Sequence, residues 1–186
     1  MIGKLMRYLQ LFFGGGGTKT EIELLKEKGL IIGDNTIIHS PYCFDQLYPW
    51  LIEVGSNCLF STDVRILAHD SSMNRVQGIT KVGRVIIGNN VYLGFRTTVL
   101  CDVRIGDNVV IGAGSVVTRD LPPNGVYAGS PARFVCSIGE FDERHRSNLI
   151  DHPQFIQPWR YWRDSATAEE RQDMKERLKN GFGYIR

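Results

Sequence analysis

Residues 87–122 read IGNNVY LGFRTT VLCDVR IGDNVV IGAGSV VTRDLP, and this six-residue period decides the fold. Every hexad opens with Ile, Leu or Val, and its fifth residue is Val, Thr, Ser or Leu. An α-helix has about 3.6 residues per turn and cannot keep a period of six on one buried face. A short strand followed by a turn, recurring at fixed length, explains the pattern. We therefore predict a solenoid whose first hexad position points inward and whose small fifth residue fills a corner.

Three such hexads make one coil of about eighteen residues, so the solenoid is a parallel β-helix with three flat faces. Similar turns recur along it: Gly33-Asp34-Asn35, Gly55-Ser56-Asn57, Gly88-Asn89-Asn90 and Gly106-Asp107-Asn108. Gly, Asn and Asp tolerate the positive φ that tight corners need. An ordinary all-β sandwich also has such turns, but its strands do not hold a six-residue phase over six units.

The phase extends towards the N-terminus, through hexads that begin at Ile32, Ile38, Val54, Phe60 and Ile66. Two insertions interrupt the count, one over residues 46–51 and a longer excursion loop over residues 71–85. A solenoid tolerates extra residues at a corner, because they bulge outward without disturbing the stack. Such excursions often carry function, and the longer one starts directly after His69-Asp70.

Residues 1–29 are expected to form an N-terminal helical segment. Its first thirteen residues place apolar side chains on one helix face, namely Ile2, Leu5, Met6, Leu9, Phe12 and Phe13. This face can pack on the protein or a neighbouring subunit, or make a peripheral membrane contact through residues 1–13. A second helix follows, with Thr18 and Glu21 as a capping box and Gly29 as its stop.

Residues 137–186 are expected to form a C-terminal extension, in which Thr167 and Glu170 predict the start of a helix over residues 168–179.

The net charge is +2 and 23% of residues are charged, so the chain carries no signal for nucleic acid. The four cysteines are widely spaced and show no metal-ligand spacing. We expect a cytoplasmic protein, peripheral to the membrane if residues 1–13 touch it.

Three motifs together carry a family resemblance: residues 66–71 (ILAHDS), residues 111–119 (IGAGSVVTR) and residues 128–133 (AGSPAR). With the hexads, they resemble the hexapeptide-repeat acyltransferases, and within these the maltose, galactoside and capsular-sugar O-acetyltransferases. The resemblance implies a left-handed parallel β-helix with flanking helices, here an all-β solenoid over residues 30–136. It also implies a homotrimer that uses acetyl-CoA as acyl donor, with no metal, to acetylate a sugar or glycan-precursor hydroxyl in polysaccharide biosynthesis.

His69 is the candidate general base, because an imidazole can take a proton from a hydroxyl as the hydroxyl attacks a thioester. Asp45 lies one coil earlier in the repeat count, so it can reach the same cleft and either orient His69 or hold a sugar hydroxyl. Asp70 adjoins His69, but neighbours on an extended chain point to opposite faces. Asp70 is therefore expected to brace the loop or bind the acceptor.

The excursion is expected to bind the acceptor, with Asn74 and Arg75 among its hydrogen-bonding groups; packing against the next subunit is the alternative. The resemblance places the CoA-binding residues at Gly94, Phe95, Gly112, Ala113, Thr118, Arg119 and Arg133. In that arrangement small residues let the pantetheine arm approach the backbone, and the two arginines bind phosphates.

Three other functions compete with sugar O-acetylation. An amino-sugar N-acetyltransferase is the nearest, and a non-catalytic β-helix assembly module is the second. A γ-class carbonic anhydrase would need three histidines on zinc, whereas only His39 and His69 lie in the repeats.

Overall fold

The computed structural model describes residues 20–41 and 43–185. The predicted apolar segment 1–13 and Thr18 lie outside this part of the chain. By its internal contacts the chain divides into two compact units, Met1–Ile138 and Gly139–Arg186, and each is considered by itself.

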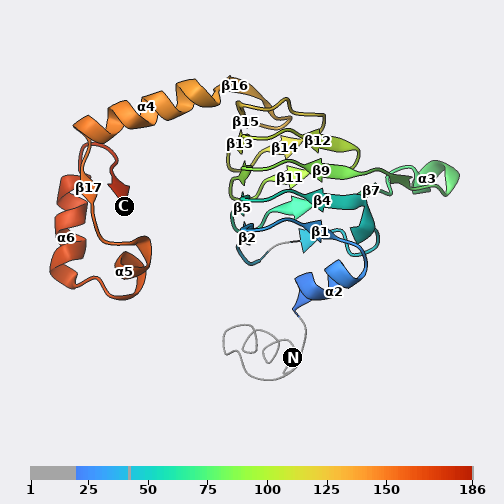
Figure 1. The fold of residues 1–186 in the computed structure, drawn as a ribbon, viewed down its shortest axis with the longest axis horizontal. Helices are drawn as coiled ribbons and strands as arrows, with labels where there is room; N and C mark the ends of the chain where they lie inside the picture. The colour runs from blue at the N-terminus through green and yellow to red at the C-terminus, as the bar shows by residue number, and fades with distance from the viewer. Residues whose placement is uncertain (1–19, 42, 186) are drawn as a thin grey trace. The chain divides into compact units, whose positions relative to one another are not determined.

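The first unit is built from short strands that form three sheets. Within each sheet, strands from successive coils lie one above another (Figure 1). The first sheet holds β1 (Ile31–Ile32), β4 (Ile52–Val54), β9 (Val85–Ile87) and β12 (Val103–Ile105). The second holds β2 (Ile37–Ile38), β5 (Leu59–Phe60), β10 (Tyr92–Leu93), β13 (Val110–Ile111), β15 (Gly125–Ala128) and β16 (Arg133–Ser137). The third holds β3 (Cys43–Phe44), β6 (Arg65–Ile66), β11 (Thr98–Val99) and β14 (Val116–Val117).

The chain visits the three sheets in rotation, and each strand pairs in parallel with its equivalent in the next coil. Only β15 with β16 is antiparallel within these three sheets. Leu93 pairs with Ile111, which is the predicted spacing of 18 residues. Earlier coils are spaced by 22 residues, as Ile38 with Phe60, and by 33, as Phe60 with Leu93. The two predicted insertions account for the longer spacings, and the register of the strands is kept across both.

Burial follows the hexad positions as predicted. The first residues of the six hexads in residues 87–122 are all buried, as are the fifth residues, including the polar Thr97 and Ser115. These two hydroxyls are satisfied, because both donate to the carbonyl oxygen of Gly112. Filling the interior with aliphatic side chains stabilises the stack by roughly 1.5–3 kcal/mol for each large one.

The corners between the first and second sheets use positive φ as predicted, and they use it at asparagine. Positive φ falls on the asparagines, with 56° at Asn35, 58° at Asn57, 56° at Asn90 and 55° at Asn108. The preceding glycines instead allow close packing of coils: a Cβ on Gly55 would lie 2.6 Å from the carbonyl oxygen of Gly88. Side-chain amides also bond from coil to coil, Asn90 to Asn108 at 3.1 Å and Asn108 to Asn124 at 2.9 Å.

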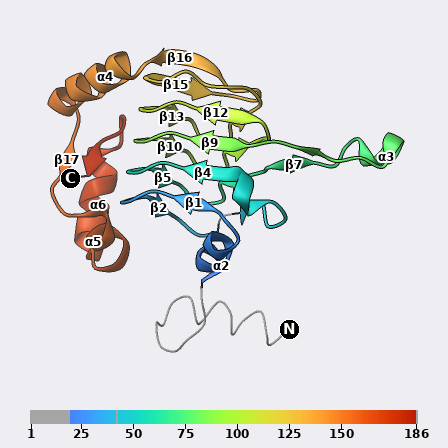
Figure 2. The ribbon, with the colours of Figure 1, turned by 45° about the vertical axis from the view of Figure 1, so that its right-hand side comes forward.

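Both insertions lie at one corner, where the chain passes from the third sheet to the first. The shorter one forms a 3-10 turn, η1 (Pro49–Leu51). The longer one projects as an arm of β7 (His69–Asp70), α3 (Asn74–Gln77) and β8 (Lys81–Val82), as Figure 2 shows. The antiparallel pairing of the arm starts with His69 opposite Val82. The excursion therefore begins at His69, two residues earlier than the predicted residue 71, and His69 is the first residue of the arm.

The helix before the first coil, α2 (Glu21–Glu27), is capped differently from the prediction. Thr20 accepts from the backbone of Glu23, and the Glu23 carboxylate accepts from the backbone of Thr20. The capping box is thus two residues later than the Thr18–Glu21 pair. Leu25 and Leu30 are buried and join the core at the end of the stack.

The second unit contains α4 (Ile138–Asp151), β17 (Gln154–Phe155), α5 (Trp159–Asp164), α6 (Ala168–Arg177) and β18 (Tyr184–Ile185). The predicted capping box of Thr167 and Glu170 is confirmed, although α6 ends at Arg177 rather than at residue 179. β17 and β18 pair in parallel. Within the described residues, no helix combines the length and apolarity needed to cross a membrane.

Candidate active site

Asp45 and His69 meet at the corner that carries both insertions. Asp45 directly follows β3, and His69 begins β7, shortly after β6, the neighbour of β3 in the third sheet. The backbone N–H of Asp45 donates to the carbonyl of Ile66, so the two strands run in register up to the corner. Phe44 pairs with Ile66, so Asp45 lies one residue and His69 three residues beyond this pair, where the two meet although they are 24 positions apart.

The Asp45 carboxylate is buried and fully hydrogen-bonded. One oxygen accepts from the Ala68 backbone at 2.8 Å and contacts His69 Nδ1. The other accepts from the backbone N–H groups of Leu47 at 3.0 Å and Tyr48 at 3.2 Å. Burial raises the pKa of Asp45, but the bonds from His69 and the three N–H groups outweigh it and leave the pKa below its ordinary value of 3.8. The pair is therefore set up to keep a negative charge beside the imidazole.

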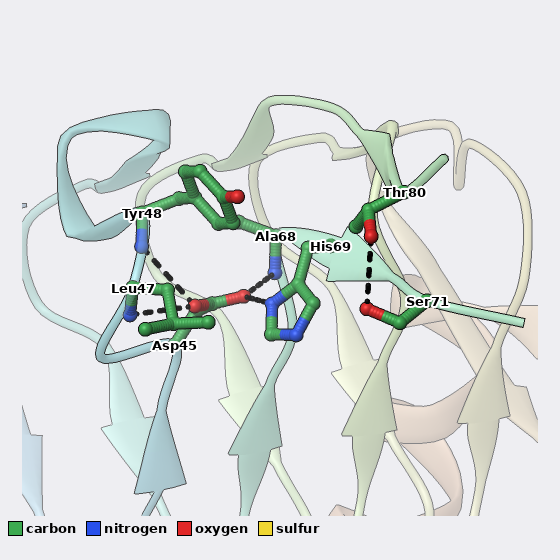
Figure 3. A network of polar contacts seen from close by, with 7 residues as sticks. All are labelled: Asp45, Leu47, Tyr48, Ala68, His69, Ser71 and Thr80. Carbon is green, nitrogen blue, oxygen red and sulfur yellow. Dashed lines mark hydrogen bonds and ion pairs between the residues drawn. The ribbon is translucent and has the colours of Figure 1, made fainter. Parts of the chain in front are cut away.

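The His69 ring lies between this carboxylate and the arm (Figure 3). Its side chain is 27% exposed, and the ring of Tyr48 approaches it edge-on with the centroids 5.5 Å apart. On the arm, the hydroxyls of Ser71 and Thr80 are hydrogen-bonded at 3.2 Å. Since Asp45 holds Nδ1, and no described residue bonds Nε2, the second ring nitrogen is available to a ligand.

A pocket of about 380 Å³ opens beside His69, lined by Leu67, His69, Asp70, Ser71, Lys81, Leu100, Cys101 and Thr118. His69, Asp70 and Thr118 had been singled out in the sequence, and the other five had not. Leu67, Leu100 and Thr118 each directly follow a strand of the third sheet. Counting hexads could have found this column, because the three residues occupy the same place in successive coils.

The arm does not bring all of its predicted residues to this pocket. Asp70 lines it, and its carboxylate accepts from the Ser72 backbone at 2.8 Å, which lowers the pKa of Asp70. Asn74 and Arg75 lie further out, in α3, where both are exposed. Neither lines the pocket, so the structure separates them from His69.

Four of the predicted CoA-binding residues lie at a different corner, between the second and third sheets. Gly94 and Phe95 follow β10, and Gly112 and Ala113 follow β13 in the next coil. A Cβ on Gly94 would lie 2.6 Å from the backbone nitrogen of Ala113, so the two turns are stacked in contact. The third sheet therefore separates this corner from His69 within one chain.

The two predicted arginines are exposed and lie apart in the fold. Arg119 directly follows Thr118 at the His69 corner. Arg133 begins β16 in the second sheet, and its guanidinium donates to the Ala132 carbonyl at 3.1 Å. Thus two of the predicted CoA-binding residues, Thr118 and Arg119, lie at the corner of His69. The other five lie elsewhere, namely Gly94, Phe95, Gly112, Ala113 and Arg133.

An imidazole with one nitrogen held by a buried carboxylate and the other open to a pocket can act as a general base. Among residues 20–41 and 43–185, no group of three or more His, Cys, Asp or Glu side chains is arranged to hold a metal ion.

Comparison with known proteins identifies the family of this chain. Residues 84–119 match the bacterial transferase hexapeptide family (six repeats). The chain is 30% identical over 143 residues to galactoside O-acetyltransferase of Escherichia coli K12, covering 66% of this chain and 70% of that protein. It is 35% identical over 100 residues to the Bacillus subtilis protein YvoF, whose name assigns it to the acetyltransferases; the match spans 54% of this chain and 56% of that protein.

Among solved structures, the chain resembles a maltose O-acetyltransferase from Clostridium difficile 630. The two are 29% identical with a TM-score of 0.53, and the match covers 69% of this chain and 81% of that one. The hexad register, the histidine at the corner of the coils and these relatives lead to one conclusion: the chain belongs to the hexapeptide-repeat acyltransferases.

Proposed function

We propose that this protein transfers the acetyl group of acetyl-CoA to a hydroxyl of a sugar or glycan precursor, with His69 as general base. The observation that carries the proposal is the His69–Asp45 pair at the mouth of the pocket. The names of relatives supply the chemical class, since they include galactoside and maltose O-acetyltransferases.

In the proposed step, the acceptor oxygen attacks the thioester carbonyl while His69 Nε2 takes the hydroxyl proton. The carbon–sulfur bond then breaks, and the proton passes to the departing CoA sulfur. Asp45 holds Nδ1–H, which keeps the lone pair on Nε2 and stabilises the positive charge that the ring gains. General-base assistance of this kind is worth about 10²–10⁴ in rate.

We propose that acetyl-CoA is bound between two copies of the chain in a homotrimer. The residues that the family resemblance assigns to CoA lie at two corners separated by the third sheet. One chain therefore offers His69, Thr118 and Arg119 on one side, and Gly94, Phe95, Gly112, Ala113 and Arg133 on another. A ring of three copies brings the first corner of each chain to the second corner of the next.

Within this proposal, the coils of residues 30–136 form a left-handed parallel β-helix, with the helical segment 1–29 and the extension 137–186 as flanking parts. The arm carrying Asn74 and Arg75 reaches acceptor or a neighbouring copy, and Asp70 braces its base. The enzyme works on the cytoplasmic side, where acetyl-CoA and activated sugars are available. Peripheral membrane contact would use residues 1–13, which lie outside the described chain.

The test measures release of the CoA thiol with acetyl-CoA and a panel of sugar and amino-sugar acceptors. His69→Ala should lower kcat by about 10²–10⁴ while CoA binding and oligomeric mass are retained. His152→Ala is the matched control, because that imidazole lies in the second unit, stacked on Phe182. Unchanged turnover in His69→Ala would overturn the assignment of the base.

A further inference from the structure

A row of aromatic side chains leads away from His69 on the side opposite the pocket column. The ring of Tyr48 lies 5.5 Å from that of His69, and the ring of Trp50 lies 5.7 Å from that of Tyr48, both edge-on. These two residues belong to the short insertion after Asp45, which no hexad requires. The insertion thus adds one aromatic ring beside the imidazole of His69 and a second ring beside the first.

Trp50 is 55% exposed, although a tryptophan normally buries most of its large ring. The backbone that carries Trp50 is closely packed. Pro49 is buried in the same turn, and Gly29 at the end of α2 leaves so little room that a Cβ there would lie 2.8 Å from the Cβ of Trp50. An exposed aromatic ring beside a second aromatic ring is a feature of binding surfaces.

His69 therefore separates two surfaces of different chemistry. The column of Leu67, Leu100 and Thr118 runs from it along the later coils. Tyr48 and Trp50 run from it along the first coil, and Asp45 lies beneath Tyr48 (Figure 3). If the thioester lies along the column, the aromatic side of the corner is left for the acceptor.

Sugars suit this surface, because a pyranose ring presents C–H groups on one face and hydroxyls at its rim. The C–H face can stack on an aromatic ring while the hydroxyls stay in water. The two centroid separations are each about the length of one sugar unit, so one unit at Tyr48 leaves its neighbour at Trp50. The surface is accordingly longer than a monosaccharide needs.

We propose that Tyr48 and Trp50 form an acceptor subsite in which Trp50 stacks on the sugar next to the one that is acetylated, so that the preferred acceptor is an oligosaccharide or a longer glycan. This inference rests on the proposed function, and it places the acceptor mainly on the short insertion rather than on α3 of the arm.

The experiment compares kcat/KM for matched acceptors of increasing length: glucose, maltose and maltotriose; galactose and lactose; N-acetylneuraminic acid and its dimer. The wild-type enzyme should prefer the longer member of the series it accepts. Trp50→Ala should raise KM for that longer acceptor about tenfold and leave kcat/KM for the monosaccharide unchanged. Trp50→Phe should restore most of the loss, because the aromatic face remains.

Phe134→Ala is the matched control, since Phe134 is a similarly exposed aromatic residue (60%) on β16, the strand at the end of the second sheet that belongs to the last coil. Equal kcat/KM for short and long acceptors, or an equal effect of Trp50→Ala on both, would overturn the subsite. Turnover of no sugar in the panel would also overturn it. Calorimetric titration with CoA then shows whether only the subsite or also the proposed function has failed. If CoA still binds, only the subsite is overturned. If CoA does not bind, the proposed acyl transfer is overturned as well.

Discussion

At the scale of single residues, Asp45 has the most consequential environment in the first unit. Its carboxylate is fully buried, yet it accepts three backbone N–H bonds and holds the imidazole of His69. A buried charge is tolerable only with such partners. Replacing it thus affects both the orientation of His69 and the stability of the corner.

Asp45→Asn should lower kcat strongly and KM little, because an amide cannot stabilise the imidazolium that forms during proton transfer. The loss should fall within the range of about 10²–10⁴ expected for a general base, and should not exceed that of His69→Ala. Steady-state kinetics checks this expectation. The double variant should be no slower than His69→Ala alone, and a further drop would mean that Asp45 acts independently of the ring.

The same substitution should change how stability depends on pH. The folded-state pKa of Asp45 lies below its ordinary value of 3.8, so its contribution is fully present above pH 3.8 and is lost as the pH falls through the folded pKa. Asp45→Asn should cost about 1–3 kcal/mol of unfolding free energy near neutral pH. The difference from wild type should narrow below pH 3.8. Urea denaturation at pH 7 and at pH 3 checks this, and a constant difference would contradict it.

Counting hexads placed Asp45 within reach of the cleft of His69, but it left open whether Asp45 or another carboxylate orients the ring. It did not reveal Tyr48, Trp50, Lys81 or Cys101 as neighbours of His69. The first three lie in the two insertions, where the six-residue period stops and gives no phase from which to place a side chain. Cys101 lies at the third position of a hexad, whose direction no packing rule assigns, and the structure shows that its side chain is buried.

At the scale of elements, the corner asparagines combine two separate contributions to the stack. Asn108 adopts a φ of 55° and bonds Asn90 and Asn124 through its side-chain amide. The backbone conformation favours Asn or Gly, whereas the bonds require the amide.

Two substitutions at Asn108 should separate these contributions. Asn108→Gly keeps the conformation and should cost about 1 kcal/mol for exposed hydrogen bonds. Asn108→Ala loses the same bonds and places in the left-handed region a residue that adopts it less readily than Asn or Gly, so it should cost about 1–2 kcal/mol more than Asn108→Gly. Chemical denaturation of both variants measures the difference. Equal losses would mean that backbone conformation contributes nothing at this corner.

Strands were predictable as elements because each strand from β9 to β14 ends at the buried aliphatic residue that opens a hexad. Helix ends were less so. Thr18 and Thr20 both precede an acidic residue by three positions, and only the structure shows that Thr20 with Glu23 forms the cap of α2. The start of the arm at His69 depends on a pairing with Val82 across an insertion, a contact that local sequence does not encode.

At the scale of the whole molecule, the proposed active site needs parts of two chains, and mixed assemblies can test this. Chains carrying His69→Ala lack the base, and chains carrying Ala113→Trp fill the other corner with a bulky ring, which the exposed position of Ala113 permits. Each variant alone should be inactive.

Coassembled at equal amounts, the two variants should recover about a quarter of wild-type activity, since one site in four then pairs an intact His69 with an intact Ala113. Activity after co-refolding, with the oligomeric mass measured by light scattering, checks this. Wild-type chains coassembled with His69→Ala chains serve as the control and should show about half. An absence of recovery would mean that each site lies within one chain.

The overall architecture of the first unit was predictable because a solenoid repeats one local rule, and each coil tests that rule again. The second unit offered no such repetition. Its short β17–β18 pair joins residues about thirty positions apart, as Gln154 with Tyr184. No sequence pattern predicts this pairing.

One further consequence follows from the position of His69 at the root of the arm. The imidazole is fixed on one side by the buried corner and on the other by the backbone pairing of β7 with β8. A displacement of the tip of the arm can therefore move the ring only through two pairs of residues, His69 with Val82 and Asp70 with Lys81. Substitutions at the tip that keep these two residue pairs intact should therefore leave the position of the His69 ring unchanged. The sequence of the tip can then vary without affecting proton transfer.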